Sequence, residues 1–323
     1  MNKNIFLVLS FSMLLSYAAE NKKTCSIFSH PNNKKQEDRA VYNEIQRDFF
    51  LGVYDGHGGH RVAEILSTDL HQYFKESLKS SECTVKNAML NAFQQIENNV
   101  LSRKCDGGST AIAAYITSDK LCLANVGDCR AILECDGCVG LATQDHTIER
   151  ADELERVLAA KATIFRHVSI QNDTQKVVKE YDWRVNGVNM TRVIGNRDLK
   201  GSLRCAFSVS GRWLPNDCTA VLELYPNNQR VDELEITPKK GQLIADPEYT
   251  EITLTEKNRW LILATDGFTD FVSNEEAVQL VVHYSQNGQS LDQITQQLVQ
   301  HAIQKGSQDN VTVMIFDLWK RHY

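Results

Sequence analysis

The order in which strand and helix patterns follow one another is the strongest constraint on the fold of this chain. Short β-type runs from Ser109 to Leu141 are separated only by turn signals such as Ser-Asp-Lys, Gly-Asp and Asp-Gly, which predicts consecutive antiparallel strands. Amphipathic helical patterns lie elsewhere and come in pairs, over residues 62–74 with 85–100 and over 275–285 with 290–304. Because strands and helices do not alternate one by one, the sequence favours an α+β fold over a doubly wound parallel sheet.

The remaining segments complete this outline. Strands are predicted over residues 49–54, 260–264 and 311–317, and a further helix over residues 149–160. Residues 19–36 are polar and are expected to form an irregular lead-in, while prolines and Asn-Asn and Lys-Lys-Gly clusters predict a loop-rich insertion near 201–246. No repeat or linker divides the chain, so we expect one domain over residues 19–323.

Composition excludes several classes of protein. The 323 residues are 42% hydrophobic and 24% charged, which is too apolar and too balanced in charge for a disordered chain. A formal net charge of −6 argues against a nucleic-acid-binding protein, which usually has a basic excess. No apolar run reaches the ~18–20 residues that a membrane span needs.

The N-terminus has the three-part layout of a secretory signal peptide. Lys3 precedes an apolar stretch from Ile5 to Tyr17, and the small residues Ser16 and Ala18 suit a cleavage site after residue 18. We therefore predict a leader over residues 1–18 and export to the periplasm or the medium. The alternative is a buried first strand or a frayed terminus, which leaves the protein in the cytoplasm.

The cysteine count does not identify the compartment. Nine cysteines leave one unpaired even if all the others form disulfides, and an odd count fits reduced, buried thiols equally well. Cys135-Asp-Gly-Cys138 has C-x-x-C spacing, but its Asp-Gly centre favours a tight hairpin turn over a metal or redox site.

Several carboxylates stand where a predicted strand begins or ends. Asp55 and Asp266 each follow a buried strand, Asp309 precedes the last strand, and Glu37-Asp38 precede the apolar Ala40-Val41-Tyr42. Converging carboxylates repel one another and need a cation, and oxygen-only ligands select hard divalent ions such as Mg²⁺ or Mn²⁺. Each Asp is alternatively a turn or cap residue, and spacing alone does not show that they converge.

Asp55-Gly-His-Gly-Gly, following Phe-Leu-Gly-Val-Tyr, is similar to the signature of the protein phosphatase 2C family, the metal-dependent Ser/Thr phosphatases. The resemblance continues in order over about residues 36–317, through Gly108-Ser-Thr-Ala, Asn125-Val-Gly-Asp-Cys-Arg130, Thr143-Gln-Asp-His146, Arg184-Val-Asn-Gly187, Thr191-Arg192, Leu263-Ala-Thr-Asp-Gly267, Ser273-Asn-Glu-Glu276 and Ser307-Gln-Asp-Asn-Val-Thr312. Any one of these motifs is a weak signal, whereas this many in order is a strong one.

The resemblance implies a fold and a metal centre. The fold would be a four-layer α/β/β/α sandwich of two antiparallel sheets flanked by helices, with two divalent cations, Mg²⁺ or Mn²⁺, at one edge. The ligands implied by matching motifs are Asp55 as the bridging carboxylate, the Gly56 carbonyl, Asp266 and Asp309 on one ion, Glu37 and Asp38 on the waters of the second ion, and Asp128 at a possible third ion.

The resemblance also implies a mechanism. Two ions roughly 3.5–4 Å apart can share a water, lower its pKa and orient it for in-line attack on a phosphate, with no covalent intermediate on the protein. His57 resembles the family's general acid, which protonates the departing oxygen of serine or threonine. Its alternative is a turn histidine at a strand end, and His60 is expected to be a surface residue at a helix start.

The chain departs from the family pattern at three places. Many members carry an Arg where this chain has Asn33, so Lys34, Lys35 and Arg39 become the candidates for binding the substrate phosphate. Since Lys lacks the bidentate fork of Arg, we expect weaker phosphate binding. The usual Gly-Asp is Gly195-Asn196 here, and a small-residue run has become Ala159-Ala-Lys-Ala162.

Three functions stay open at this point. The first is an active protein Ser/Thr phosphatase acting on phosphorylated proteins, which we expect to be a monomer without a stable membrane span. The second is a pseudophosphatase that binds phosphoproteins or regulators without turnover. The third is an exported phosphomonoesterase for small molecules, with the same metal centre.

Overall fold

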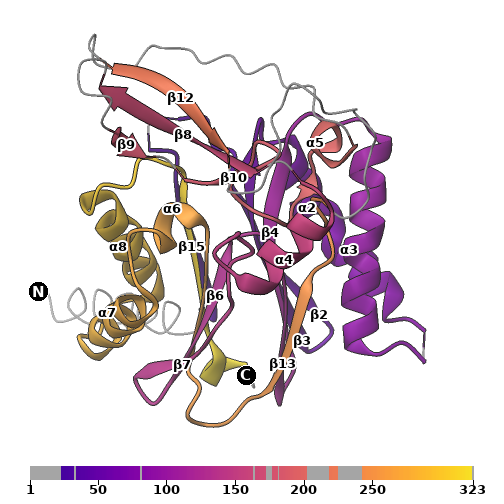
Figure 1. Ribbon diagram of the computed structural model, residues 1–323. Helices are drawn as coiled ribbons and strands as arrows, with labels where there is room; N and C mark the ends of the chain where they lie inside the picture. The colour runs from indigo at the N-terminus through magenta and orange to yellow at the C-terminus, as the bar shows by residue number, and fades with distance from the viewer. Residues whose placement is uncertain are drawn as a thin grey trace, which may run out of the picture.

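The computed structural model describes residues 23–32, 34–80, 82–162, 164–171, 177–180, 182–201, 218–224 and 242–321. Two antiparallel sheets packed face to face form its centre (Figure 1). Sheet A has the order β1-β15-β14-β6-β7, made of β1 (Cys25–His30), β6 (Arg130–Cys135), β7 (Cys138–Ala142), β14 (Trp260–Ala264) and β15 (Val311–Asp317). Sheet B has the order β13-β5-β4-β3-β2, made of β2 (Arg39–Ile45), β3 (Asp48–His57), β4 (Gly108–Ile116), β5 (Lys120–Val126) and β13 (Glu248–Thr253), with the short β11 (Ile194–Gly195) beside β4.

Two pairs of helices cover the outer faces of the sheets. The pair α2 (Arg61–Ser77) and α3 (Val85–Ser102) packs on sheet B, and the pair α7 (Asn274–Gln286) and α8 (Leu291–Gln304) packs on sheet A (Figure 1). Helix α8 begins with a capping box, in which the side chains of Ser290 and Gln293 each bond to the other's backbone N–H.

Strand β4 shows why the fold has four layers. All nine of its residues are buried, because both of its faces are covered. Ala111 and Ala113 pack in the core with α2 and α3, whereas Ile112 and Ala114 pack in the core between the two sheets. This period-2 division confirms the four-layer α/β/β/α sandwich and the α+β class.

A smaller third sheet lies across one end of the sandwich (Figure 1). It contains β8 (Ile164–Gln171), β9 (Val177–Glu180), β10 (Arg184–Val185) and β12 (Cys218–Leu224), and the helices α4 (Ala151–Ala159) and α5 (Arg197–Gly201) lie nearby along the chain. A separate cluster of buried side chains holds this unit together: Ile148, Val157, Ala162, Ile164, Val185, Val188, Met190, Val193 and Leu243.

Two of the predicted irregular segments contain strands. The expectation of an irregular lead-in over residues 19–36 is wrong for β1, which pairs with β15 at the edge of sheet A. The predicted loop-rich segment 201–246 also contains β12, which pairs with β8 along its length. Both strands are specified by distant partners rather than by local alternation. Residues 202–217 and 225–241, Asn33 and the leader at 1–18 lie outside the described residues.

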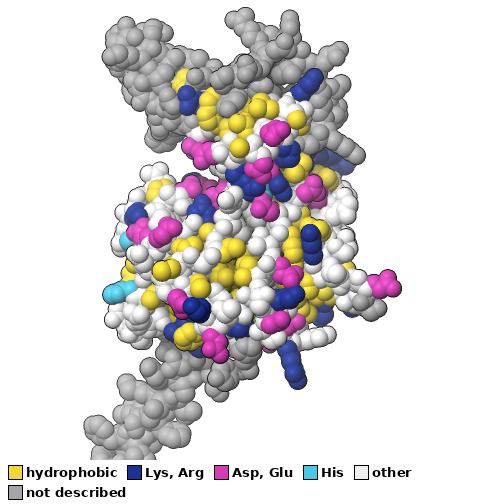
Figure 2. Space-filling model, turned by 60° about the horizontal axis from the view of Figure 1, so that its bottom comes forward, with side chains coloured by type: hydrophobic (Ala, Val, Ile, Leu, Met, Phe, Trp, Pro, Cys, Tyr) yellow, Lys and Arg dark blue, Asp and Glu magenta, His cyan; other side chains and the backbone are white. Residues whose placement is uncertain are grey.

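The C-x-x-C segment forms the predicted hairpin turn. Cys135 and Cys138 are directly paired across β6 and β7, and Asp136 and Gly137 have φ values of 51° and 81°, as a type I′ turn requires. The seven cysteines whose side chains are described are all free thiols. Within the described chain, no helix is both long enough and apolar enough to cross a membrane. Acidic and basic side chains are interspersed over the face shown in Figure 2.

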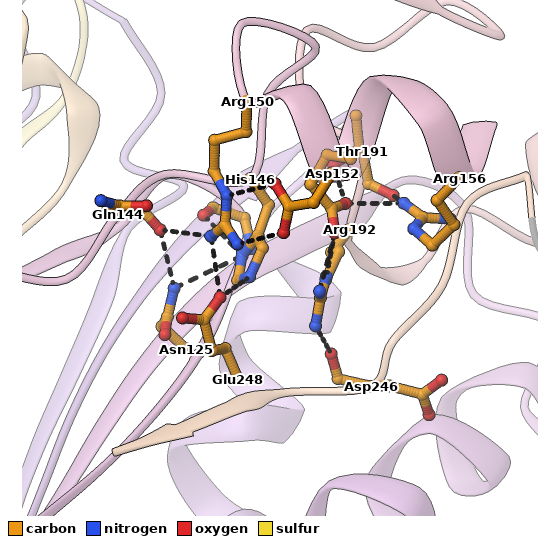
Figure 3. A network of polar contacts seen from close by, with 12 residues as sticks. Asn125, Gln144, His146, Arg150, Asp152, Arg156, Thr191, Arg192, Asp246 and Glu248 are labelled. Atoms are coloured by element: carbon orange, nitrogen blue, oxygen red, sulfur yellow. Dashed lines mark hydrogen bonds and ion pairs between the residues drawn. The ribbon is translucent and has the colours of Figure 1, made fainter. Parts of the chain in front are cut away.

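A polar network joins sheet B to the segment that carries α4 (Figure 3). His146 is fully buried; its Nδ1 accepts from the Gly127 N–H at 3.1 Å, so its proton lies on Nε2, which donates to Glu248 Oε2 at 3.2 Å. Arg150 donates to the same Glu248 oxygen at 2.7 Å. Burial and the neighbouring charge of Arg192 lower the pKa of His146 to about 4, so the ring is neutral at pH 7.

We expect this histidine to make the protein sensitive to mild acid. The unfolded chain takes up a proton on His146 near pH 6.5, whereas the folded chain resists it until about pH 4, so the folded state loses stability as the pH falls through this window. Denaturant unfolding of the wild type and of His146→Gln at pH 7.5 and pH 4.5 measures the difference. The wild type should lose about 2–3 kcal/mol more than the variant, and an equal loss would contradict the prediction.

Candidate metal centre

Several strand ends meet at one edge of the sandwich. In sheet B, Tyr54 near the end of β3 pairs with Arg39 at the start of β2. In sheet A, Ala264 at the end of β14 pairs with both Val313 and Arg130. Because antiparallel neighbours start and stop at the same sheet edge, the residues that precede or follow these strands are brought together.

The residues at this edge surround a pocket of about 550 Å³. Nine of the eleven residues proposed from the sequence line it: Lys34, Lys35, Glu37, Asp55, Gly56, His57, Asp128, Asp266 and Asp309. Asp55 and Gly56 come from the end of β3, and Asp266 is the first residue of the short helix α6 (Asp266–Thr269) that follows β14. Asp309 precedes β15 in the chain.

Asp38 and Arg39 do not line the pocket. Asp38 is buried behind it, where its Oδ2 accepts from Thr312 Oγ1 at 2.7 Å and from Thr265 Oγ1 at 3.1 Å. The Arg39 guanidinium donates to the backbone carbonyls of Gln36 and Asp38 at 3.1 and 2.8 Å. Arg39 therefore holds the chain that carries Glu37 and Asp38, rather than facing the pocket.

Burial and mutual repulsion raise the pKa values of the clustered carboxyl groups. The pKa of Asp55 lies well above its usual range, first because the group is buried and then because of the charges of Asp266 and Asp38. Burial, opposed by the Thr312 hydrogen bond, also raises the pKa of Asp38 to about 7. The pKa of Asp266 is raised in the same way, by burial and by the charge of Asp309. Without a cation, these groups resist ionisation together.

The same carboxylates have oxygen atoms that no protein group satisfies. Oδ1 of Asp38 and Oδ1 of Asp266 are buried and accept no hydrogen bond. Across the described residues, no three His, Cys, Asp or Glu side chains are arranged to hold a metal ion as they stand. Orphaned carboxylate oxygens around a polar pocket nevertheless fit hard divalent cations, which prefer oxygen ligands and retain several waters.

Gly56 is required by the close approach of two chain segments. A Cβ at this position would lie 2.7 Å from the Glu37 backbone carbonyl, so any other residue would push the Glu37 segment away from β3. Asn310 fixes the same segment, because its Oδ1 accepts from the Glu37 N–H at 2.7 Å and its Nδ2 donates to the Pro31 carbonyl at 3.0 Å.

Two of the three basic residues predicted from the sequence to bind phosphate, Lys34 and Lys35, line the pocket. Lys34 Nζ lies 3.1 Å from Asp309 Oδ1, and the two side chains are 52% and 57% exposed. Such an exposed ion pair contributes little to stability, but it places positive charge at the pocket mouth.

His57 reaches the pocket from the last position of β3. Its Nε2 lies 2.6 Å from Asn196 Oδ1. Burial lowers the pKa of His57, while the Asn196 hydrogen bond and the charges of Glu37 and Asp266 oppose this effect. His60 is an exposed residue before α2, 3.6 Å from Glu64, and it does not line the pocket.

Sequence reasoning from strand ends missed several residues of the pocket. Thr110, Arg184, Gly187, Val188, Asn189, Met190 and Asn310 also line it. Most of these come from the segment after β9, which has little periodicity of its own. The signal available in the sequence is the motif Arg184-Val-Asn-Gly187, whose spacing alone does not indicate a role.

Comparison of the chain with known proteins identifies the class to which this sandwich, with its acidic pocket at one edge, belongs. A family model described as protein phosphatase 2C matches residues 17–311. The chain is 31% identical over 270 residues to probable protein phosphatase 2C 71 of Arabidopsis thaliana, covering 82% of this chain and 47% of that protein. It is 30% identical to probable protein phosphatase 2C 69 of the same plant, covering 82% of this chain and 60% of that protein. The chain belongs to the protein phosphatase 2C family.

Solved structures agree on the fold. A serine-threonine phosphatase 2C from Toxoplasma gondii superposes with a TM-score of 0.59 at 18% identity, covering 91% of this chain and 94% of that one. A C. elegans sex determining protein superposes with a TM-score of 0.65 at 21% identity, covering 91% of this chain and 64% of that one. The chain spans about half the length of the first Arabidopsis relative, 47%.

Proposed function

We propose that the protein hydrolyses phosphoserine and phosphothreonine in proteins with the help of bound Mg²⁺ or Mn²⁺. The observation that supports this most is the pocket in which Glu37, Asp55, Asp128, Asp266 and Asp309 lie together at one sheet edge. Such a cluster is costly to build, since Asp55, Asp128 and Asp266 are desolvated beside other groups of the same charge. Family membership supports the assignment of metal-dependent phosphate hydrolysis to this cluster.

The proposed ligands are the ones that the resemblance implies. Asp55, Asp266, Asp309 and the Gly56 carbonyl would hold one ion, Glu37 and Asp38 the waters of a second, and Asp128 a possible third. When bound, the ions would supply positive charge for the phosphate oxygens and an activated water. The chain itself orients Asp38 through Thr265 and Thr312 and leaves its other oxygen unpartnered.

His57 is the proposed proton donor to the departing serine or threonine oxygen. It lines the same pocket as the carboxylates, so its ring can reach a phosphate bound there. The alkoxide of serine or threonine is strongly basic and leaves poorly without a proton, which is the demand that such a donor meets. No side chain needs to bond covalently to phosphorus in this scheme.

One assay tests this function. Hydrolysis of a phosphothreonine peptide and of p-nitrophenyl phosphate is measured with Mn²⁺ or Mg²⁺, with and without a chelator. We expect turnover of both substrates that the chelator abolishes. Activity that survives the chelator would contradict the metal-dependent scheme, and absence of activity with both ions would favour the pseudophosphatase. A strong preference for p-nitrophenyl phosphate would favour a small-molecule phosphomonoesterase.

We expect the lysines at the pocket mouth to bind substrate phosphate less tightly than an arginine would. Asn33→Arg should lower KM for the phosphopeptide because a guanidinium adds a bidentate phosphate contact, and Lys34→Ala should raise KM by about 3–10-fold because a charge is lost. Steady-state kinetics measure both, with the exposed Lys79→Ala as the control that leaves KM unchanged. Unchanged KM in both variants would argue against a phosphate site at this mouth.

Three further features of the protein stay predictions: a single catalytic domain over residues 19–323, a monomeric state, and export by a leader at residues 1–18. N-terminal sequencing of the mature protein tests the leader, because a chain that begins at residue 19 would establish cleavage. A chain that retains its first residues would favour the cytoplasmic alternative.

A further inference from the structure

The hydrogen bond between His57 and Asn196 joins two residues that are 139 positions apart in the chain. His57 is the last residue of β3, and Asn196 follows β11 directly. Strand β4 lies between them, since Gly108 pairs with His57 on one side and with Gly195 on the other. His57 lines the pocket, whereas Asn196 does not line it and is only 9% exposed. Asn196 therefore contacts the ring from behind the pocket wall.

The backbone of Asn196 is held on both sides. Its N–H donates to the Gly107 carbonyl at 2.8 Å, and its carbonyl accepts from the N–H groups of Leu199 and Lys200 at 2.9 and 3.1 Å. Its φ is 47°, in the left-handed region that Asn tolerates better than most residues. The side-chain amide is thus presented to the histidine from a fixed point.

Gly108 leaves room for this contact. A Cβ at Gly108 would overlap Asn196 Oδ1 and would lie 2.8 Å from His57 Nε2. The middle strand therefore carries a residue without a side chain at the one position where the ring and the amide meet.

We propose that Asn196 is a positioning residue for His57, holding its ring by accepting the Nε2 proton so that the other ring nitrogen serves proton transfer. This inference rests on the proposed function. An amide oxygen only accepts, so the ring nitrogen facing it must carry a proton. The protonated ring then gives its Nδ1 proton to the bridging oxygen as the O–P bond breaks. The ring is left neutral with its remaining proton on Nε2, still held by Asn196.

Position 196 carries an amide rather than a carboxylate. An amide can orient the imidazole through a hydrogen bond but adds no negative charge beside it. The orientation of the His57 ring can therefore be tested separately from a charge beside it. Asn196→Ala removes the hydrogen-bond acceptor, whereas Asn196→Asp keeps an acceptor oxygen at the same distance and adds a negative charge.

Comparing kcat for substrates with different leaving groups tests the role of the proton donor. p-Nitrophenolate leaves without a proton, whereas the threonine alkoxide requires one. We expect Asn196→Ala to lower kcat for a phosphothreonine peptide by ~10-fold or more and to change kcat for p-nitrophenyl phosphate by less than about 2-fold. General acid catalysis accelerates a reaction by ~10²–10⁴-fold, and this variant loses only the positioning of the acid. KM should stay the same for both substrates. Asn196→Asp should retain most of the peptide activity, and the exposed Arg197→Ala is the neighbouring control without effect.

A double-mutant cycle separates this role from a structural one. If Asn196 acts through His57, Asn196→Ala should lower peptide kcat no further in a His57→Gln background. Equal loss on both substrates, or a full additional loss in the His57→Gln background, would overturn the inference while leaving the proposed function standing. A wild type without activity on either substrate would overturn the proposed function, and the inference with it.

The protonation of the His57 ring can also be measured directly, without an activity assay. In protein labelled with ¹⁵N-histidine, the wild-type His57 signal should show a proton on Nε2, and Asn196→Ala should lose this preference. A wild-type ring with its proton on Nδ1 would overturn the inference independently of any assay.

Discussion

Asp266→Asn is expected to abolish metal-dependent phosphatase activity while making the metal-free protein more stable. Asp266 lines the pocket, one of its oxygens is buried without a partner, and its pKa is raised by burial and by the charge of Asp309. Asparagine keeps the shape of the side chain and removes the charge. The activity is lost because a neutral amide is a poor ligand for Mg²⁺ or Mn²⁺ at such a site.

The gain in stability follows from the sign of the pKa shift. An acid with a raised pKa in the folded state binds its proton more tightly there than in the unfolded chain. Its destabilising effect is therefore absent below about pH 4, where Asp is protonated in both states, and grows as the pH rises. At pH 7.5 with chelator, we expect the melting temperature to rise by ~2–4 °C, which corresponds to about 1 kcal/mol for a domain of this size.

Melting curves with and without Mn²⁺, and kcat/KM for the phosphopeptide, measure the two effects. We expect kcat/KM to fall at least ~100-fold and the stabilisation by Mn²⁺ to shrink. The matched control is Asp270→Asn at the end of the same short helix, where burial and the charge of Asp266 raise the pKa to about 6. It should also stabilise the metal-free protein, but it should retain activity. Full activity in Asp266→Asn would remove Asp266 from the proposed metal centre.

Glu153→Gln is expected to cost about 3 kcal/mol of stability, because it breaks a nearly buried ion cluster. The Glu153 side chain is 2% exposed and accepts from Arg192 and Arg156, both at 2.7 Å, and from the Thr191 hydroxyl. Arg192 also donates to the Asp246 carbonyl at 2.9 Å, so this cluster ties α4 to two later segments (Figure 3). Neutralising the glutamate leaves two guanidinium groups without their shared counter-charge.

The pH dependence identifies the cause. Burial alone would raise the pKa of Glu153, but the hydrogen bonds from Arg192, Arg156 and Thr191 outweigh it and lower the pKa to about 2. The stabilisation is therefore complete above the unfolded pKa of about 4.5 and is lost as the pH falls toward 2. Denaturant unfolding should show a large difference between wild type and variant at pH 7 that shrinks below pH 4.5. Glu155→Gln, exposed on the same helix, should change stability by less than about 0.5 kcal/mol, and an equal effect of both variants would contradict the assignment.

Helices and core strands could be predicted closely from the sequence. The patterns over residues 62–74 and 290–304 match α2 and α8 to within a few residues, because helix periodicity and capping depend on neighbours within one or two turns. Strand β1 and strand β12 could not be found in this way. Each is stabilised by a partner far along the chain, and its own residues lack a clear alternation.

The candidate site also has features that the sequence predicts and others that only the structure shows. Positions of the carboxylates at strand ends were readable from the sequence, and the motif order indicated their family. The surroundings of Arg39 and Asp38 required the structure: Arg39 donates to backbone carbonyls, and Asp38 is buried with one carboxylate oxygen hydrogen-bonded and the other without a partner. Thr312, 274 residues from Asp38, supplies one of its hydrogen bonds.

By itself, the sequence determined which residue types stand at each strand end, since turns, caps and periodicity depend on local contacts. Only the tertiary structure decided that Asp55, Asp266 and Asp309 border one pocket and that Asn196 lies against His57. The physical reason is that these contacts depend on strand pairing and sheet packing between segments that are far apart in the chain, and no local spacing encodes such pairings.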